Sequence, residues 1–306
     1  MSIRQVLSEG GRQVLRFRKL MVFFYAANLL AALVVAVPAA ALIASRLSRS
    51  LESDRLFASF DPSWISETVL LYRGAVFSAA GLMTLAVAVL FLVLNVFLAG
   101  GALAVFHRED DTFFGACSRF FPRMFRILLL ALIAYGIVSF INSSIAGGID
   151  QIKKTSMQAW PFTVLHWIRL LITGLLLGTV NMIFDYAKIV CVAENRRSAF
   201  RSVAAAIRFT FSNACPAFAI YWICSGVGLL FLLAYHGASE LIGQASMPAV
   251  TLLFLVRQAC MLCRMWVRLW TWSSEMGFYV AGLPAVAPEP PPVVITEGPL
   301  EPLEVL

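Results

Sequence analysis

Six apolar segments, each long enough to cross a lipid bilayer, alternate with short polar stretches along the chain. They cover residues 20–44, 74–99, 127–147, 164–186, 217–236 and 248–270. A membrane-spanning helix needs about 20 apolar residues. Because lipid offers no partners to backbone amides, each segment has to be helical. The pattern predicts an all-α fold, a polytopic membrane helix bundle with six transmembrane helices in one domain over residues 20–280.

The flanking and connecting stretches carry weaker helical patterns. Residues 1–19 place Ile3, Val6 and Val14 near one face and arginines elsewhere, which fits either a cytoplasmic amphipathic helix or a frayed basic leader. The connectors 111–126 and 198–211 mix phenylalanine with arginine, a pattern typical of amphipathic elbow helices in the membrane interface. Residues 281–306 are rich in proline and glutamate and have no basic residue, which predicts a disordered, acidic cytoplasmic tail.

Composition and charge support a membrane protein with a defined orientation. The chain is 60% hydrophobic and only 13% charged, with a net charge of +7. Fourteen basic residues fall on one side of an alternating topology: Arg4, Arg12, Arg16, Arg18, Lys19, Arg108, Arg119, Arg123, Arg126, Lys188, Arg196, Arg197, Arg201 and Arg208. The positive-inside bias then predicts that both termini are cytoplasmic. This distribution favours contact with anionic headgroups of inner-leaflet lipids and argues against nucleic-acid binding.

Neither cysteine nor histidine forms a recognisable chemical motif. The six cysteines fall in predicted spans or cytoplasmic connectors, so a disulfide framework is not expected. Cys260 and Cys263 have the CxxC spacing but lie inside a span without a second pair. His107, His166 and His236 belong to different levels of the bundle. We therefore expect no cofactor, no metal site and no catalytic residue.

The last span carries arginines where leucine would be usual. One stripe of it contains Arg257, Met261, Arg264, Arg268, Trp272 and Glu275. Such a stripe cannot face lipid, because a charge at mid-bilayer costs about 3 kcal/mol. A rise of about 1.5 Å per residue places Arg257 roughly 14 Å from Pro248, near the midplane. Since no acidic residue at that level is an obvious partner, a water-filled cavity is expected there.

The same depth estimate gathers several polar residues at one level of the cytoplasmic half. The predicted cluster consists of Asn95, Asn181, Asp185, Arg264 and Arg268, with Asp185 bonded to one of the two arginines. Two interpretations stay open for it. It is either a clamp between helices, or a pocket for an anionic headgroup or solute, since guanidinium groups suit phosphate and carboxylate.

Two motifs resemble a known family. Asn95-Val-Phe-Leu-Ala-Gly-Gly-Ala precedes the first elbow, and the second follows Asp185-Tyr-Ala-Lys and Glu194-Asn-Arg-Arg. Over roughly residues 74–279 the chain resembles uncharacterised six-span proteins of the bacterial inner membrane. These are distantly similar to the membrane domain fused to some glycerophosphodiester phosphodiesterases. The resemblance implies a location in the bacterial inner membrane but no reaction, because no part of this sequence corresponds to the phosphodiesterase domain.

Function is therefore predicted only by class. The first interpretation is a non-enzymatic scaffold or a partner subunit of a membrane complex, with the acidic tail as a candidate contact for a protein. The alternative is a transporter or lipid-handling protein with an arginine-lined cavity on the cytoplasmic side. A lipid-modifying enzyme is a third interpretation, although the sequence holds no catalytic signature.

Overall fold

Helices account for all the regular secondary structure in the part of the chain that the structure describes. The computed structural model describes residues 2–47, 73–107, 112–155, 160–242 and 247–283. Within these ranges the helices are α1 (Ile3–Arg16), α2 (Lys19–Leu47), α5 (Arg73–Phe106), α6 (Phe113–Thr155), α7 (Trp160–Ala193), α8 (Ala199–Ser212), α9 (Ala214–Ile242) and α10 (Met247–Gly282). The all-α prediction is confirmed for these residues. Helix α10 continues to Gly282, and the predicted disordered tail lies outside the described residues from position 284 onward.

The described helices make this a multi-pass membrane protein. Five of them contain stretches long and apolar enough to cross a membrane: Leu85–Phe106, Phe113–Ile149, Phe162–Ala193, Ala214–Ile242 and Pro248–Gly282. Helix α2 contributes a sixth span only as one arm of a pair with α1, bent by 72°. The prediction of six spans therefore stays a prediction, with five to six supported by length and composition.

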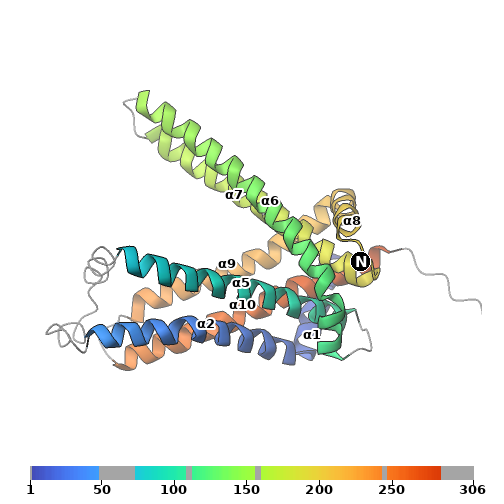
Figure 1. Cartoon of the computed structure of the whole chain (residues 1–306). Helices are drawn as coiled ribbons and strands as arrows, with labels where there is room; N and C mark the ends of the chain where they lie inside the picture. Colours follow the sequence, from blue (N-terminus) through green and yellow to red (C-terminus); the bar gives the residue numbers. More distant parts are fainter. Residues whose placement is uncertain (1, 48–72, 108–111, 156–159, 243–246, 284–306) are drawn as a thin grey trace, which may run out of the picture.

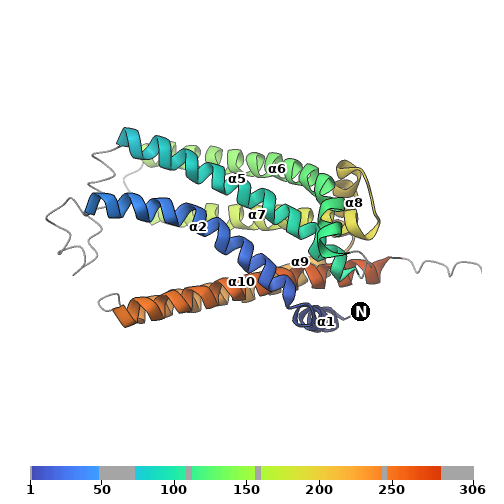
Figure 2. The same ribbon diagram turned by 60° about the horizontal axis from the view of Figure 1, so that its bottom comes forward.

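The long helices run up and down, and one end of the molecule collects the basic connections. Helices α2, α5, α9 and α10 lie together, while the hairpin of α6 and α7 diverges from them toward the opposite end (Figure 1). The N-terminus, α1, α8 and the last turns of α10 all lie at the same end (Figures 1 and 2). We call this the basic end, because those of the basic residues named above that the structure describes, all but Arg108, lie in or next to its connections.

The first predicted elbow is not a separate helix. Residues 113–126 form the beginning of α6, which continues without interruption to Thr155. Pro122 lies inside this helix, and Figure 2 shows the first turns of α6 curving away from its long arm. Proline bends helices more often than it ends them in membranes, because neighbouring groups satisfy the freed carbonyl. The second elbow is separate, as predicted, and forms α8.

The N-terminal segment is a docked helix, so the alternative of a frayed leader is wrong. Ser2 caps α1 through a capping box. Gly10 lies so close to Ser274 of α10 that no side chain would fit between them. The indole Nε1 of Trp270 donates to the carbonyl oxygen of Leu7 at 2.8 Å. These contacts hold α1 against the last turns of α10.

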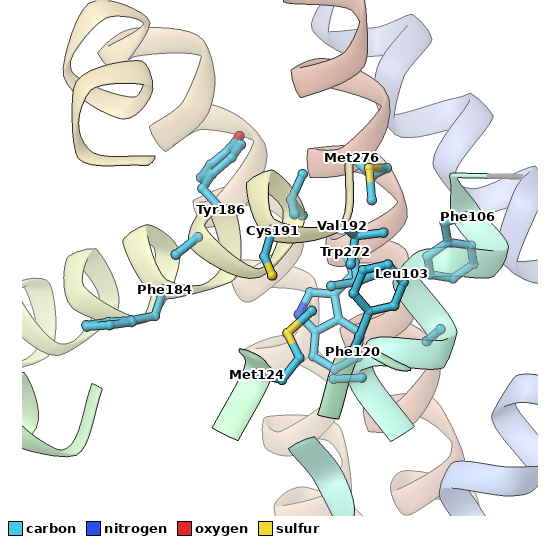
Figure 3. Packing of buried hydrophobic residues seen from close by; sticks show 14 of the residues in the cluster. Leu103, Phe106, Phe120, Met124, Phe184, Tyr186, Cys191, Val192, Trp272 and Met276 are labelled. Carbon is cyan, nitrogen blue, oxygen red and sulfur yellow. The ribbon is translucent and has the colours of Figure 1, made fainter. Parts of the chain in front are cut away.

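The apolar core is concentrated at the basic end. Figure 3 shows Trp272 of α10 next to Leu103 of α5 and to Phe120 and Met124 of α6. All four side chains are almost fully buried. Farther from this end the helices expose leucine and isoleucine, as expected where side chains meet lipid. The core therefore fixes the helices at the basic end, where the polar cluster also lies.

Candidate functional site

A cavity of about 630 Å³ lies between α7, α9 and α10 near the basic end. Its lining comprises Asn181, Asp185 and Lys188 of α7, Tyr221, Ser225, Gly228, Leu229 and Leu232 of α9, and Arg264, Val267, Arg268, Thr271 and Trp272 of α10. Four of the six residues predicted for the site belong to this lining: Asn181, Asp185, Arg264 and Arg268. The depth estimate from sequence therefore brought the right helices together at the right level.

Asn181 is the hub that ties three helices at one wall of the cavity. Its Oδ1 accepts a hydrogen bond from Tyr135 of α6 at 3.0 Å. Its Nδ2 donates to the hydroxyl of Tyr221 on α9 at 3.0 Å and to Oδ2 of Asp185 at 3.2 Å. One amide thus satisfies three partners at once. This arrangement matches the interpretation of a clamp between helices, and it also fixes where Asp185 points.

The predicted pairing of Asp185 with an arginine of α10 is wrong. Lys188 donates to Oδ1 of Asp185 at 2.7 Å, and the two residues are three positions apart on α7. Residues at this spacing lie next to each other on one helix surface, so the pair forms without any constraint from neighbouring helices. The carboxylate is nearly buried, with 8% of its side chain exposed. Asp185 still interacts electrostatically with Arg268, but no direct ion pair joins them in the described part of the chain.

Arg268 is held in place by two neutral groups. Its Nη1 donates to Oδ1 of Asn95 on α5 at 3.3 Å. Its guanidinium lies 4.8 Å from the ring centroid of Trp272, a distance at which cations are attracted to aromatic faces. Lys188 Nζ lies 5.6 Å from the same ring. Asn95 therefore belongs to the site as a support behind Arg268, although it does not line the cavity itself.

The other two predicted arginines have different environments. Arg264 lines the cavity, its side chain is exposed, and it makes no hydrogen bond or ion pair within the described ranges. Arg257 is also exposed but does not line this cavity. The structure thus separates Arg257 from the cluster, and the cavity does not extend to it as the sequence had suggested. Arg264 differs from Lys188 and Arg268, the other cations of the lining, in having neither a hydrogen bond nor an ion pair nor an aromatic contact among the described residues.

Several residues of the site were missed from sequence. Lys188 was assigned to topology, although its spacing from Asp185 was a signal for an ion pair. Trp272 and Glu275 were placed on the arginine stripe without a role. Glu275 is fully buried, and neither of its carboxyl oxygens has a hydrogen-bond partner among the residues that the structure describes. Tyr135 gave no signal, since nothing in its local sequence points toward Asn181.

The charges of the lining favour an anion. Arg264, Arg268 and Lys188 are positive, and Asp185 alone is negative, so the lining carries an excess of two positive charges. Guanidinium groups bind phosphate and carboxylate through paired N–H donors. A search of the described residues finds no group of three or more His, Cys, Asp or Glu side chains that could hold a metal ion. Anion binding is the chemistry that this arrangement can perform.

No protein-family model, curated protein or solved structure matches this chain. The resemblance to six-span inner-membrane proteins therefore stays a prediction. The function has to be argued from the geometry of the cavity and from the charge distribution.

Proposed function

We propose that this protein is a lipid-binding protein of the bacterial inner membrane, with both termini in the cytoplasm. Its ligand is an amphiphile with a phosphate-bearing headgroup, held in the cavity between α7, α9 and α10. The observation that carries the proposal is the mixed character of the lining. It combines the cations Lys188, Arg264 and Arg268 with the apolar side chains of Leu229 and Leu232 on α9.

Charged and apolar groups of the lining lie at overlapping levels of the bundle. Helix α9 starts at the basic end, so Leu232 lies about 27 Å from its first residue. Arg264 also lies about 27 Å from Gly282, where α10 ends at the basic end, and Val267 of α10 packs against Gly228 of α9. A phosphate bound by Arg264 and Arg268 would therefore place the acyl chains of an amphiphile against Leu229 and Leu232. A small hydrophilic anion would leave these apolar side chains of the cavity without a function.

Arg264 favours ligand binding over a purely structural clamp. The Asn181 hub and the Asp185–Lys188 pair are complete by themselves and need no ligand. Arg264 contributes to neither of them. An unpaired charge near the membrane is costly, on the order of 3 kcal/mol at the bilayer centre, and a bound phosphate would offset part of that cost. The scaffold interpretation gives Arg264 no role, and it gives none to Arg257, which lies outside the cavity.

The orientation supports a ligand from the cytoplasmic leaflet. The thirteen of the fourteen basic residues that the structure describes belong to helices and connections of the basic end, and Arg268 and Lys188 are the cations of the cavity nearest to it. Under the positive-inside bias this end faces the cytoplasm. The cytoplasmic leaflet is also the one in which anionic lipid produces a negative surface potential. The cavity is placed to take its ligand from that leaflet.

Ligand-dependent stabilisation of the full chain in neutral detergent tests the proposal. Phosphatidylglycerol, phosphatidylcholine and inorganic phosphate are added separately, and the apparent melting temperature is followed by tryptophan fluorescence. A ligand present at 100 times its Kd stabilises the folded state by about 2.7 kcal/mol. We expect phosphatidylglycerol to raise the melting temperature more than phosphatidylcholine does, and inorganic phosphate to have little effect.

Two arginine variants of the same helix provide the matched comparison. Arg264→Gln removes the unpaired charge of the cavity, and Arg257→Gln removes an exposed charge outside it. The shift caused by phosphatidylglycerol should be smaller in Arg264→Gln than in Arg257→Gln. Equal shifts in both variants would contradict the proposal. If inorganic phosphate raised the melting temperature as much as phosphatidylglycerol does, the ligand would be a soluble anion and not a lipid.

A further inference from the structure

Helix α8 has its large apolar side chains on the outside. The residues that it buries against the protein are small: Ala199, Ser202, Ala206 and Thr210. Its exposed face carries Phe200, Ile207 and Phe211, with exposed fractions of 73%, 40% and 66%. The helix lies on the outside of the bundle at the basic end (Figure 1). The sequence predicted an amphipathic helix at residues 198–211, and the structure turns its large apolar side chains away from the protein.

Such a face requires an apolar medium that the protein itself does not supply. Burying a phenylalanine side chain is worth roughly 1.5–3 kcal/mol, so two outward phenylalanines would be unfavourable in water. The same helix exposes Arg201 and Arg208 and contains no acidic residue. Outward aromatic residues combined with arginine are typical of helices that lie in the interface of an anionic membrane. A bilayer surface would supply such a medium for the outward face of α8.

A groove beside α8 adds a specific site to this surface. It has a volume of about 490 Å³ and lies between α6 and the start of α8. Arg126 and Arg197 lie at its two sides, and both are exposed. Leu129, Leu130 and Phe200 form its apolar wall. Neither arginine has a hydrogen bond or ion pair with any part of the chain that the structure places.

We propose that this groove binds one anionic phospholipid of the bilayer. The phosphate lies between Arg126 and Arg197, and the acyl chains follow Leu129 and Leu130 along α6 and contact Phe200 of α8. Charge complementarity selects the occupant, because the groove offers two unpaired guanidinium groups and no acidic side chain. The site shares no residue with the cavity of α7, α9 and α10 and does not depend on the function proposed for it.

Photo-crosslinking of the full chain in nanodiscs tests this site. The discs contain phosphatidylcholine with a small fraction of either phosphatidylglycerol or phosphatidylcholine that carries a diazirine in one acyl chain. Labelled peptides are identified and quantified by mass spectrometry. We expect the phosphatidylglycerol probe to label the peptides that contain Leu129 and Phe200 at least threefold more than the phosphatidylcholine probe does.

Substitution of the arginines identifies what selects the lipid. The double variant Arg126→Gln with Arg197→Gln should lower labelling by the anionic probe to the level of the neutral probe. The single variant Arg197→Gln should lower it partly, and Arg208→Gln, an exposed arginine of α8 outside the groove, should leave it unchanged. Equal labelling by the two probes in the wild type would overturn the proposal. Unchanged labelling in both the single and the double variant would overturn it as well.

Discussion

The contact between α5 and the first turns of α6 is the packing feature whose disruption can be predicted most directly. Gly101 lies where α5 touches Phe113 and Cys117. A Cβ atom at position 101 would lie 2.8 Å from Cε2 of Phe113 and 2.9 Å from its carbonyl oxygen, and closer still to Sγ of Cys117. Carbon atoms in contact prefer about 3.5–4.0 Å. Because one of these neighbours is backbone, Gly101→Ala would force α5 and α6 apart.

The size of this effect follows from two opposing terms. Overpacking a tight contact costs typically about 1–3 kcal/mol. Replacing glycine by alanine inside a helix gains about 1 kcal/mol from helix propensity. Gly174→Ala isolates the packing term, because a Cβ atom at that position of α7 meets nothing within 4 Å. We expect Gly101→Ala to be less stable than Gly174→Ala by the full packing cost, about 1–3 kcal/mol.

Thermal unfolding of the purified full chain measures this difference. The seven tryptophans report unfolding by fluorescence, and both variants are measured in the same detergent. Gly101→Ala should melt several degrees below Gly174→Ala, which should itself melt at or above the wild type. If the two alanine variants melted at the same temperature, the close approach of α5 and α6 would be refuted.

Three further predictions concern the polar residues of the basic end, each measured as a change in apparent melting temperature. Asn181→Leu should destabilise the protein by at least about 1–3 kcal/mol, since it leaves buried partners of the hub without a hydrogen bond; Thr179→Leu, an exposed change on the same helix, is its control. Asp185→Asn should lower the melting temperature because Lys188 loses its counter-charge. Glu275→Gln should leave the melting temperature unchanged or raise it, because the Glu275 carboxyl group is buried without a hydrogen-bond partner among the described residues. A lower melting temperature for Glu275→Gln would point to an ion pair of Glu275 that is not among the described contacts. Asn195 has a φ of 48°, in the left-handed region, so Asn195→Val should be destabilising by about 1–2 kcal/mol more than Asn195→Gly; equal stability would argue against that backbone conformation.

The apolar pattern predicted the helices well, because lipid leaves a long apolar segment no alternative to a helix. It also grouped residues of different helices by level, since helical rise relates position in sequence to position along a helix axis. Asn181, Asp185, Arg264 and Arg268 accordingly line one cavity. The level of a residue does not determine the direction in which its side chain points around the helix axis. For this reason the partner of Asp185 was wrongly expected on α10.

Other differences have the same origin in packing between helices. The amphipathic pattern of α8 identified its apolar face, but only the tertiary structure reveals that small residues such as Ala206 face the protein and Phe211 faces outward. The elbow at residues 111–126 was expected as a helix separate from the span that follows it. Pro122 does not supply one, because a proline within a membrane helix bends the chain more readily than it stops it. The sequence placed Asn95 at the level of Arg268, but only the structure shows that its Oδ1 accepts a hydrogen bond from Arg268.

The cavity between α7, α9 and α10 is proposed to bind one anionic lipid through Arg264. Native mass spectrometry of the full chain, released from detergent that contains phosphatidylglycerol, counts the lipids that stay bound. The wild type and Arg257→Gln should retain the same number, and Arg264→Gln should retain one fewer at the same lipid concentration. Identical lipid counts for Arg264→Gln and the wild type across the titration would contradict the account.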